Sequence, residues 1–165
     1  IRYLLVKPSD VGIYVEKGAA DIGVVGKDIL LENDYDIYEL LDLNLGICKV
    51  SVDVLSGYKE DTERKLRVAT KYVNIAKKYY SSLNRETDII KLNGSIELAP
   101  ILNLSDVIVD IVETGNTLRE NNLKVIEDIE EISARFIVNK VSLKFKNEII
   151  EKIIGKVREA IWLEQ

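Results

Sequence analysis

The sequence predicts an α/β protein built from mostly parallel sheets with flanking helices. Short apolar runs rich in β-branched residues alternate with segments in which apolar residues recur at helical spacing. Such alternation is typical of sheets whose faces are covered by helices. A polar, charged segment at 57–64 interrupts it and indicates a boundary between two lobes.

Composition excludes several functional classes. The 165 residues contain no histidine, which removes His-based catalytic triads and His metal sites. A net charge of -5 with interspersed signs argues against a nucleic-acid partner, and no apolar run is long enough to span a membrane. Cys48 is the single cysteine, so an internal disulfide is impossible, and we expect a buried, inert thiol in a reducing cytoplasm.

In the first part of the chain, four apolar runs predict strands at 2–6, 22–25, 37–41 and 47–54. Asp10 is a candidate N-cap for a helix through Glu16, which Lys17-Gly18 would end. A second helix is expected from Lys27 to Glu32. Its start combines backbone N–H groups with the Lys27 ammonium, which suits a bound anion as well as it suits a solvated helix cap.

In the rest of the chain we expect strands at 66–70, 89–92, 107–112 and 133–138, with a less regular alternation at 125–131. Helices are expected at 72–83, 95–102 and 149–161. Tyr72, Tyr79 and Tyr80 lie on the apolar stripe of the first of these helices. Core packing is the simpler interpretation of these tyrosines, and stacking on a nucleotide base is the alternative.

The run at 107–112 and the residues after it form the main candidate site. The run is apolar except for Asp110, and it leads into the small, polar turn Glu113-Thr114-Gly115-Asn116-Thr117 and a helix-compatible segment. A strand that turns into a helix start gathers unpaired backbone N–H groups, which can hold a phosphate. A carboxylate in an apolar strand is costly unless it faces a crevice at the strand's carboxyl end. Asp110 and Glu113 beside a phosphate site would suit the hydroxyls of a sugar phosphate.

The five turn residues also allow a simpler interpretation. Thr117 and Glu120 have the spacing of a capping box, in which Thr117 would cap the helix, and Gly115 would only supply a positive φ. On these residues alone an ordinary capped turn is the simpler choice. The two acids Asp110 and Glu113 favour the ligand site.

Two further segments are candidates for the same crevice. Asn93-Gly94-Ser95 precedes a predicted helix and, with Glu97, could form a second anion cradle. Thr70-Lys71 follows a predicted strand and could present a hydroxyl and a cation. Each segment is unspecific by itself, and the argument rests on several strand ends meeting at one crevice.

The stretch from Glu97 to Leu118 resembles the signature of the ATP phosphoribosyltransferases of histidine biosynthesis. The matching residues are Glu97, Ser105, Ile108, Asp110, Thr114, Gly115, Thr117 and Leu118. Asn103 stands where the family has glycine, and asparagine is the residue that next most readily takes a left-handed conformation. The resemblance extends through GAADIGVVGKDILLE, LRVATKY and ISARFIVN, and so covers nearly the whole chain.

This resemblance implies a two-lobed fold of the periplasmic-binding-protein type II kind. Its first lobe would be discontinuous, with residues 1–53 and 133–165, and its second lobe would contain residues 54–132. It also implies transfer of the phosphoribosyl group of phosphoribosyl pyrophosphate to N1 of ATP, with Mg²⁺ on the diphosphate. The bend at 114–117 would hold the 5-phosphate, and Asp110 and Glu113 would orient the ribose. Lys7 stands where the family usually has an arginine that helps to hold ATP or the leaving pyrophosphate, and Lys27 is the second candidate for that role.

The resemblance further implies the short form of the enzyme, which works in a hetero-oligomer with a regulatory subunit that resembles histidyl-tRNA synthetase. It implies that a few dozen residues with a first strand and a basic loop precede Ile1. Two alternatives stay open. A non-enzymatic small-anion or effector-binding module could share the fold. A phosphoribosyltransferase for a free base would usually carry two adjacent acids, and Ile111 occupies the second place here.

Overall fold

The computed structural model describes residues 1–163, which form two compact units. Unit 1 contains residues 1–47 and the chain from Ser133 onward, and unit 2 contains Cys48–Ile132. The division at 132/133 is the expected one. The first division lies at 47/48, before β3 (Cys48–Leu55), and not at 53/54. The charged segment 57–64 is therefore a loop inside unit 2, because the strand before it already belongs to that unit's sheet.

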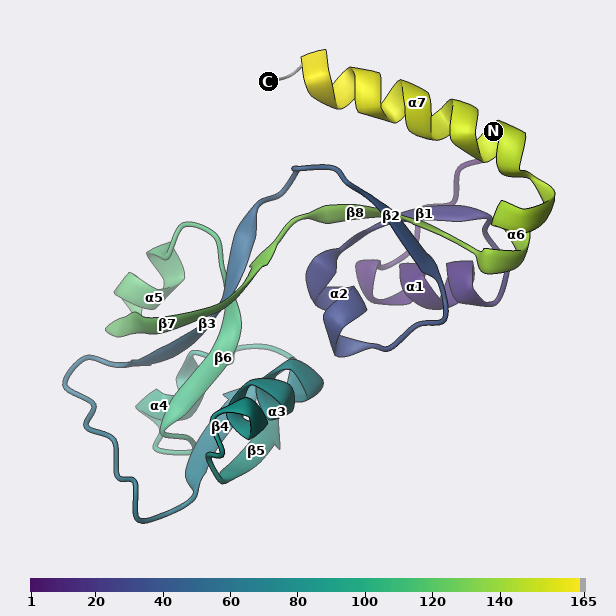
Figure 1. The fold of residues 1–165 in the computed structure, drawn as a ribbon. Helices are drawn as coiled ribbons and strands as arrows, with labels where there is room; N and C mark the ends of the chain where they lie inside the picture. The colour runs from purple at the N-terminus through teal and green to yellow at the C-terminus, as the bar shows by residue number, and fades with distance from the viewer. Residues whose placement is uncertain (164–165) are drawn as a thin grey trace. The chain divides into compact units, whose positions relative to one another are not determined.

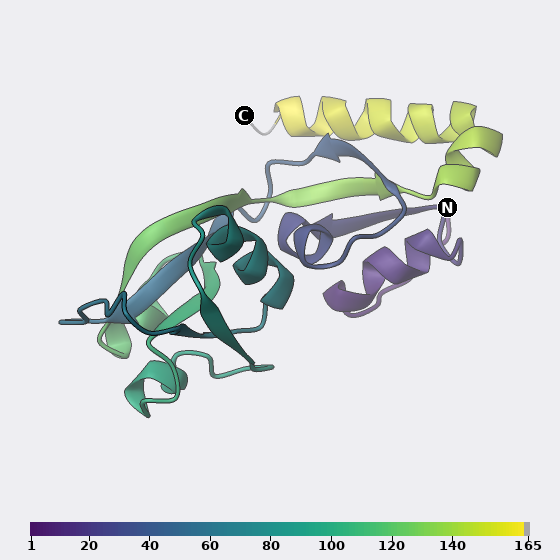
Figure 2. The ribbon, with the colours of Figure 1, turned by 60° about the horizontal axis from the view of Figure 1, so that its bottom comes forward.

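The elements of unit 1 alternate as the sequence predicts. They are α1 (Pro8–Glu16), β1 (Ile22–Gly26), α2 (Lys27–Glu32), β2 (Tyr38–Asp42), β8 (Ala134–Val138), α6 (Lys140–Phe145) and α7 (Asn147–Leu163). The sheet has the order β1-β8-β2. Helices α1 and α2 pack on one face through Val15 and Ile29, and α7 packs on the other through Ile150 and Ile154, as Figures 1 and 2 show.

Unit 2 contains a five-stranded sheet with the order β5-β4-β6-β3-β7. Its elements are β3, β4 (Leu66–Thr70), α3 (Val73–Ser82), β5 (Thr87–Lys91), α4 (Leu98–Ile101), β6 (Val107–Val112), α5 (Asn116–Glu120) and β7 (Leu123–Ile132). Helix α3 covers one face, and α4 and α5 lie on the other (Figure 1). On that second face, Ala99 of α4 and Leu118 of α5 join one buried cluster with Ala69 and Ile108 of the sheet.

Most strand pairs are antiparallel, so the expectation of mostly parallel sheets is wrong. Among the strands of residues 1–163, the pairs β1–β8, β2–β8, β3–β6 and β3–β7 are antiparallel, and the pairs β4–β5 and β4–β6 are parallel. The reversed strand in each sheet is the first one after the chain has come from the other unit: β3 in unit 2 and β8 in unit 1. In each unit this strand joins the sheet without a preceding helical crossover, and it pairs with a strand on either side. The other strands within each sheet share one direction.

Three local expectations also need correction. Residues 2–6 form no strand and are largely exposed, with Leu5 fully so, because neither edge of the β1-β8-β2 sheet pairs with them. Helix α1 begins at Pro8 with Lys7 as N-cap, and Asp10 lies in its first turn. Proline at the first helical position explains this start, since its fixed φ suits a helix and its missing N–H costs nothing there. Helix α6 was not expected; the side chain of Asn139 caps it by accepting from Ser142 N at 2.9 Å.

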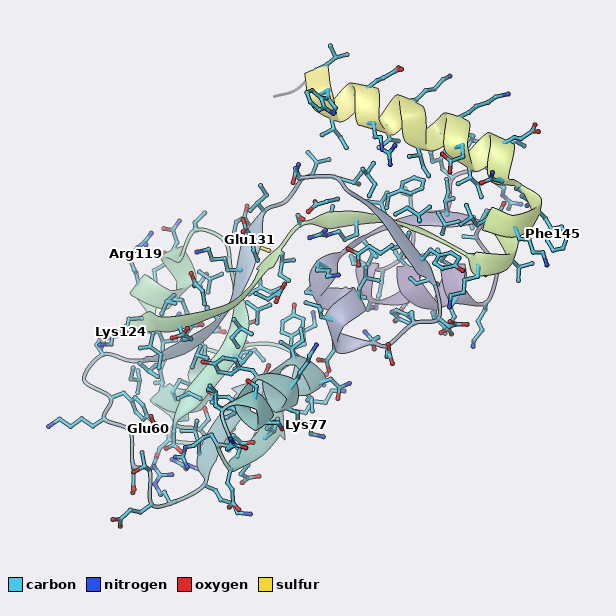
Figure 3. The ribbon with its side chains drawn as sticks, viewed as in Figure 1. Glu60, Lys77, Arg119, Lys124, Glu131 and Phe145 are labelled. Carbon is cyan, nitrogen blue, oxygen red and sulfur yellow. The ribbon has the colours of Figure 1, made fainter. Side chains whose placement is uncertain are left out.

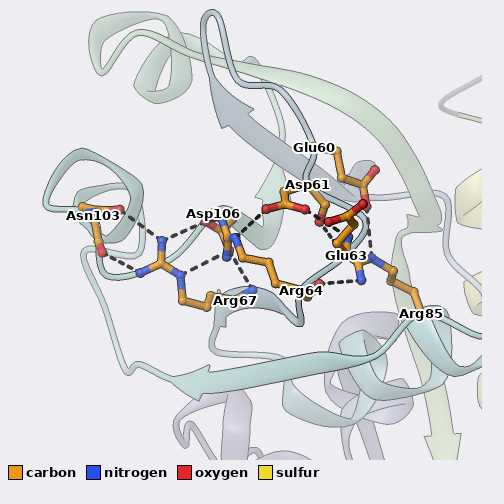
Figure 4. A network of polar contacts seen from close by, with 8 residues as sticks. All are labelled: Glu60, Asp61, Glu63, Arg64, Arg67, Arg85, Asn103 and Asp106. Atoms are coloured by element: carbon orange, nitrogen blue, oxygen red, sulfur yellow. Dashed lines mark hydrogen bonds and ion pairs between the residues drawn. The ribbon is translucent and has the colours of Figure 1, made fainter.

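An ion-pair network binds the 57–65 loop to the amino ends of β4 and β6 (Figure 4). The Asp106 carboxylate accepts from the guanidinium groups of Arg64 and Arg67, at 2.8 Å for the shortest contact of each. Arg67 also donates to the carbonyl and side-chain oxygens of Asn103. Asn103 has a φ of 57°, so it takes the left-handed conformation expected where the family has glycine.

Cys48 was expected to be buried, but it is half-buried at the start of β3. Within residues 1–163, every helix is too short or too polar to cross a membrane.

Candidate active site

The carboxyl ends of the parallel strands β4, β5 and β6 meet at one edge of the unit 2 sheet. The segments that leave this edge begin at Lys71, Leu92 and Glu113. Together with Thr70 in β4 and Asp110 in β6, they include all the candidate site residues of unit 2. Because Ile96, Ala99 and Leu118 share one apolar cluster, the segments before α4 and α5 are held against the same face of the sheet.

The bend after β6 depends on Gly115. It has a φ of 70° and is the N-cap of α5, whose first residue is Asn116. Thr117 is therefore the second residue of the helix, and the predicted capping box is wrong. The Thr114 hydroxyl takes part of that role by accepting from Asn116 N at 3.4 Å. A left-handed residue at this point turns the chain within one residue, which a side chain at position 115 would oppose.

The bend leaves backbone donors for a ligand. In the first turn of α5, Arg119 N bonds to Gly115 O at 3.1 Å. The N–H groups of Thr117 and Leu118 have no acceptor among residues 1–163, as the first N–H groups of a helix lack intrahelical partners. Helix α5 has only five residues, so the local N–H groups of the bend contribute more to anion binding than the dipole of the helix as a whole.

Arg119 is a site residue that the sequence analysis missed. It projects from α5 (Figure 3), and its guanidinium turns back over the bend to bond Thr114 O at 3.2 Å and the Asn116 side chain. Its Nη1 lies 3.3 Å from the place where a Cβ on Gly115 would be. Arg119 could have been identified from its position four residues after Gly115, because residues at this spacing lie on the same side of a helix.

Asp110 is half-buried near the carboxyl end of β6 and accepts from Ile111 N at 2.8 Å. Burial raises the pKa of its carboxyl above the ordinary value; nearby Glu97 raises this pKa further, whereas nearby Lys71 lowers it. Glu97 and Lys71 are thus near enough to Asp110 for their charges to affect it. Glu113 is exposed on the bend.

The 93–97 segment has a strained backbone. Asn93, Gly94 and Ser95 are exposed, and Ser95 has a φ of 49°, which is uncommon for a residue other than glycine, asparagine or aspartate. Glu97 is the half-buried N-cap of α4. Strain of this kind costs roughly 1–3 kcal/mol and persists where surrounding structure enforces it, often at ligand sites.

Thr70 has a different position from the one expected for a ligand contact. It is fully buried, and its hydroxyl donates to Val109 O at 2.6 Å and accepts from Tyr72 N at 2.8 Å. The side chain therefore joins β4 to β6 and fixes the start of α3. The neighbouring Lys71 is exposed, with its ammonium 5.5 Å from the Tyr72 ring. Tyr72 and Tyr80 are buried in the core, as the simpler interpretation predicted.

Lys7 and Lys27 both lie in unit 1 and are not part of the cluster formed within unit 2. Lys7 is exposed before α1. Lys27 makes an ion pair of 2.6 Å with Glu39, which in turn contacts Arg135 at 3.3 Å. Any anion that binds Lys27 must compete with this carboxylate.

The fold and the bend together define the general class of protein. This is an α/β protein in which polar groups converge at the carboxyl ends of parallel strands, the position where open α/β sheets bind ligands. The model of the ATP phosphoribosyltransferase family, HisG, matches residues 7–159. The chain therefore belongs to the ATP phosphoribosyltransferase family.

Individual relatives agree with this assignment. The ATP phosphoribosyltransferase of Brachyspira hyodysenteriae is 72% identical over 98% of this chain and 79% of its own length. That of Clostridioides difficile is 59% identical over 96% of this chain and 77% of its own length. The enzymatic function is thus the one predicted: formation of N1-(5-phosphoribosyl)-ATP and pyrophosphate, the first step of histidine biosynthesis.

Solved structures support the fold. The "ATP phosphoribosyl transferase (HisG:HisZ) complex from Thermotoga maritima" matches with a TM-score of 0.87 and 39% identity, over 95% of this chain and 78% of that one. The periplasmic aliphatic sulphonate binding protein SsuA from Escherichia coli matches with a TM-score of 0.63 and 11% identity, over 94% of this chain and 60% of that one. The second likeness concerns the fold alone, which confirms the periplasmic-binding-protein type II architecture and gives the binding-module alternative no further support.

Proposed function

We propose that unit 2 binds phosphoribosyl pyrophosphate at the 113–119 bend and presents its C1 atom to N1 of the adenine of ATP. The observation that carries this proposal is the left-handed bend at Gly115, which leaves two backbone N–H donors without an acceptor in the described part of the chain, next to the half-buried acid Asp110. Donors for a phosphate and an acceptor for hydroxyls thus lie at the two ends of one short segment.

The 5-phosphate would bind the N–H groups of Thr117 and Leu118 and the hydroxyl of Thr114. Arg119 would add a cation, since its guanidinium already lies over the bend. Its present partners are a carbonyl and an amide oxygen, both neutral. A phosphate is a stronger partner for a guanidinium than either, because both groups are charged and can form two parallel hydrogen bonds.

The ribose hydroxyls would donate to Asp110 and Glu113. One carboxylate oxygen of Asp110 accepts from Ile111 N, which leaves Asp110 further acceptor positions for a ligand. The loop 93–95 and Glu97 would line another side of the same site. Lys71 would offset the negative charges of Asp110 and Glu97. Thr70 would act only indirectly, by holding the end of β4 against β6.

In the reaction the lone pair of adenine N1 forms a bond to C1 of the ribose. The bond from C1 to the pyrophosphate oxygen breaks, and its electron pair leaves with pyrophosphate. The sugar gains positive charge during this displacement, so the carboxylates of Asp110 and Glu113 stabilise it electrostatically. No proton has to be removed from a nucleophile, which suits a protein without histidine.

Mg²⁺ would neutralise the diphosphate and assist its departure. Within residues 1–163 no cluster of three or more acidic, cysteine or histidine side chains could form a complete metal site. This donor set fits an ion that arrives on the substrate, because Mg²⁺ commonly keeps several waters and takes its other ligands from phosphates. Lys7 and Lys27 remain the candidates for holding pyrophosphate, with Lys27 exchanging Glu39 for the anion.

The proposed assembly is a hetero-oligomer with a regulatory subunit that resembles histidyl-tRNA synthetase. The Thermotoga maritima neighbour, described as a HisG:HisZ complex, supports a partner of this kind. A single cysteine supports a reducing compartment, so we place the enzyme in the cytoplasm.

The test is an assay of the full-length enzyme with its regulatory partner, ATP, Mg²⁺ and phosphoribosyl pyrophosphate. Formation of the N1-substituted adenine changes the ultraviolet absorbance. We expect Asp110→Asn to lower kcat by roughly 100-fold, as loss of one stabilising charge does in other active sites. The matched control is Asp88→Asn on the exposed side of β5, which should keep wild-type activity. Equal activity of Asp110→Asn and the control would contradict the assigned role.

A further inference from the structure

A second acid lies inside the sheet beneath the proposed site. Ser51 and Asp53, both on β3, are fully buried, with no solvent exposure. The Ser51 hydroxyl donates to Asp53 Oδ1 at 2.8 Å. The other carboxylate oxygen, Oδ2, is buried and has no hydrogen-bond partner among residues 1–163. A fully buried carboxyl with one oxygen unpaired is costly as an anion, so it calls for an explanation.

The strand register places this pair beside Asp110, on the neighbouring strand. Ser51 is opposite Asp110 in the antiparallel β3–β6 ladder, and Asp53 is opposite Ile108. Residues paired in a ladder, and residues two apart on one strand, share a face of the sheet. Ser51, Asp53 and Asp110 therefore lie on the same face, and Asp53 is the diagonal neighbour of Asp110, one step further from the ligand edge.

The charged groups around Asp53 are acids. Asp110 on β6 and Asp128 on β7 both raise the pKa of its carboxyl, whereas the Ser51 hydrogen bond lowers it; burial is the largest cause, and the result is a pKa of about 7. Lys49, also on β3, is paired with Asp128 at 2.5 Å. On this face, α4 and α5 contribute the apolar residues Ala99 and Leu118 to the adjoining core, and the segment before α4 contributes Ile96.

We propose that Asp53 in its neutral form is a positioning residue for Asp110, and that ionisation of Asp53 weakens the binding of phosphoribosyl pyrophosphate. With Asp53 neutral, the carboxyl group of Asp110 faces the ribose without a further buried charge on the neighbouring strand. When Asp53 loses its proton, a second buried negative charge faces the polyanionic substrate with only a hydroxyl to compensate it. The inference rests on the proposed function of Asp110 and deepens that function. It assigns the pH dependence of phosphoribosyl pyrophosphate binding to Asp53, a residue that does not contact the ligand.

The experiment measures the dissociation constant of phosphoribosyl pyrophosphate for the full-length enzyme with its regulatory subunit, by titration calorimetry between pH 6 and 9. The ligand's own phosphates also titrate, so the quantity compared is the ratio of wild-type to Asp53→Asn dissociation constants at each pH. We expect this ratio to be close to one at pH 6 and to rise roughly tenfold by pH 9. One uncompensated charge at about 10 Å in a medium of effective dielectric constant about 20 gives an effect of that order.

Two further variants separate this role from a structural one. Ser51→Ala removes the hydrogen bond that favours the ionised form of Asp53, so the midpoint of the pH dependence should move upward while the low-pH affinity is kept. Glu130→Gln is the matched control: Glu130 is exposed on β7 and paired with Val50, on the opposite face. It should leave the midpoint at its wild-type value.

A ratio that stays constant from pH 6 to 9, or a Ser51→Ala midpoint equal to that of the wild type, would overturn the inference and leave the proposed function intact. Failure of the wild-type enzyme to bind phosphoribosyl pyrophosphate at any pH would overturn both.

Discussion

Replacing Asp106 with asparagine removes the centre of the network that fixes the 57–65 loop. Asp106 is nearly buried and accepts five hydrogen bonds: two from Arg64, two from the Arg67 side chain and one from Arg67 N, at distances between 2.8 and 3.2 Å. An asparagine in the same place keeps one acceptor oxygen. Its amide group would then point two donors at guanidinium groups that also only donate.

The expected loss of stability is about 2–3 kcal/mol at pH 7. Removing one member of a buried ion pair typically costs about 3–5 kcal/mol. The value should be smaller here, because the side chains of Arg64 and Arg67 remain 48% and 31% exposed and water can replace part of the lost contact.

The pH dependence of this loss has a definite sign. Hydrogen bonds from Arg64, and after them those from Arg67, hold the pKa of Asp106 far below its ordinary value of 3.8. Because the folded-state pKa is lowered, the stabilisation is complete above the unfolded-state pKa and disappears as the pH falls toward the folded-state pKa. The difference between wild type and Asp106→Asn should therefore be constant above about pH 5 and shrink below about pH 4.

Urea unfolding followed by circular dichroism between pH 3 and 8 measures both effects. Asp88→Asn is the control: Asp88 is an exposed acid on the neighbouring strand β5, and its replacement should change the free energy of unfolding by less than about 0.5 kcal/mol. A loss below about 0.5 kcal/mol for Asp106→Asn, or a loss that does not shrink in acid, would refute the assignment of this network.

Three further changes have expected outcomes. Gly115→Ala should raise the dissociation constant of phosphoribosyl pyrophosphate and cost about 1–2 kcal/mol of unfolding free energy, since alanine disfavours a φ of 70°; unchanged binding in calorimetry would count against the bend. Gly12→Ala should destabilise unit 1 by about 1–3 kcal/mol, because its Cβ would lie 2.2 Å from the Tyr35 ring, and Gly12→Ala with Tyr35→Leu should recover part of the loss in thermal unfolding. Asp53→Asn should be more stable than wild type by up to about 4 kcal/mol above pH 7, given a pKa raised from 3.8 to about 7, with the difference vanishing below about pH 4; equal urea midpoints at pH 8 would contradict this.

Much of unit 2 could be predicted because its strands are strongly marked. The limits expected for β4 and β6 are those observed, since each is a mostly apolar, largely buried run between polar breaks. Strand direction could not be predicted in the same way. Local patterns give a strand's burial but not its neighbours, and the reversed strands β3 and β8 follow from the chain passing twice between the units.

The candidate site was predicted in part. The bend at Gly115 and the interrupting acid Asp110 were visible because they break an apolar pattern. Asp53 breaks its own apolar run, VSVDVL, in the same way that Asp110 breaks VIVDIV, so the same argument could have identified it. The return of Arg119 onto the bend and the burial of Thr70 depend on side-chain directions, which residue type and spacing do not determine.

The most direct test of the central claim is a crystal structure of the enzyme with phosphoribosyl pyrophosphate bound. We expect 5-phosphate oxygens at roughly 2.7–3.2 Å from the backbone nitrogens of Thr117 and Leu118, the Arg119 guanidinium on the same phosphate, and ribose hydroxyls donating to Asp110. A 5-phosphate held at the 93–95 segment or on unit 1, with the 114–117 bend unoccupied, would contradict the account.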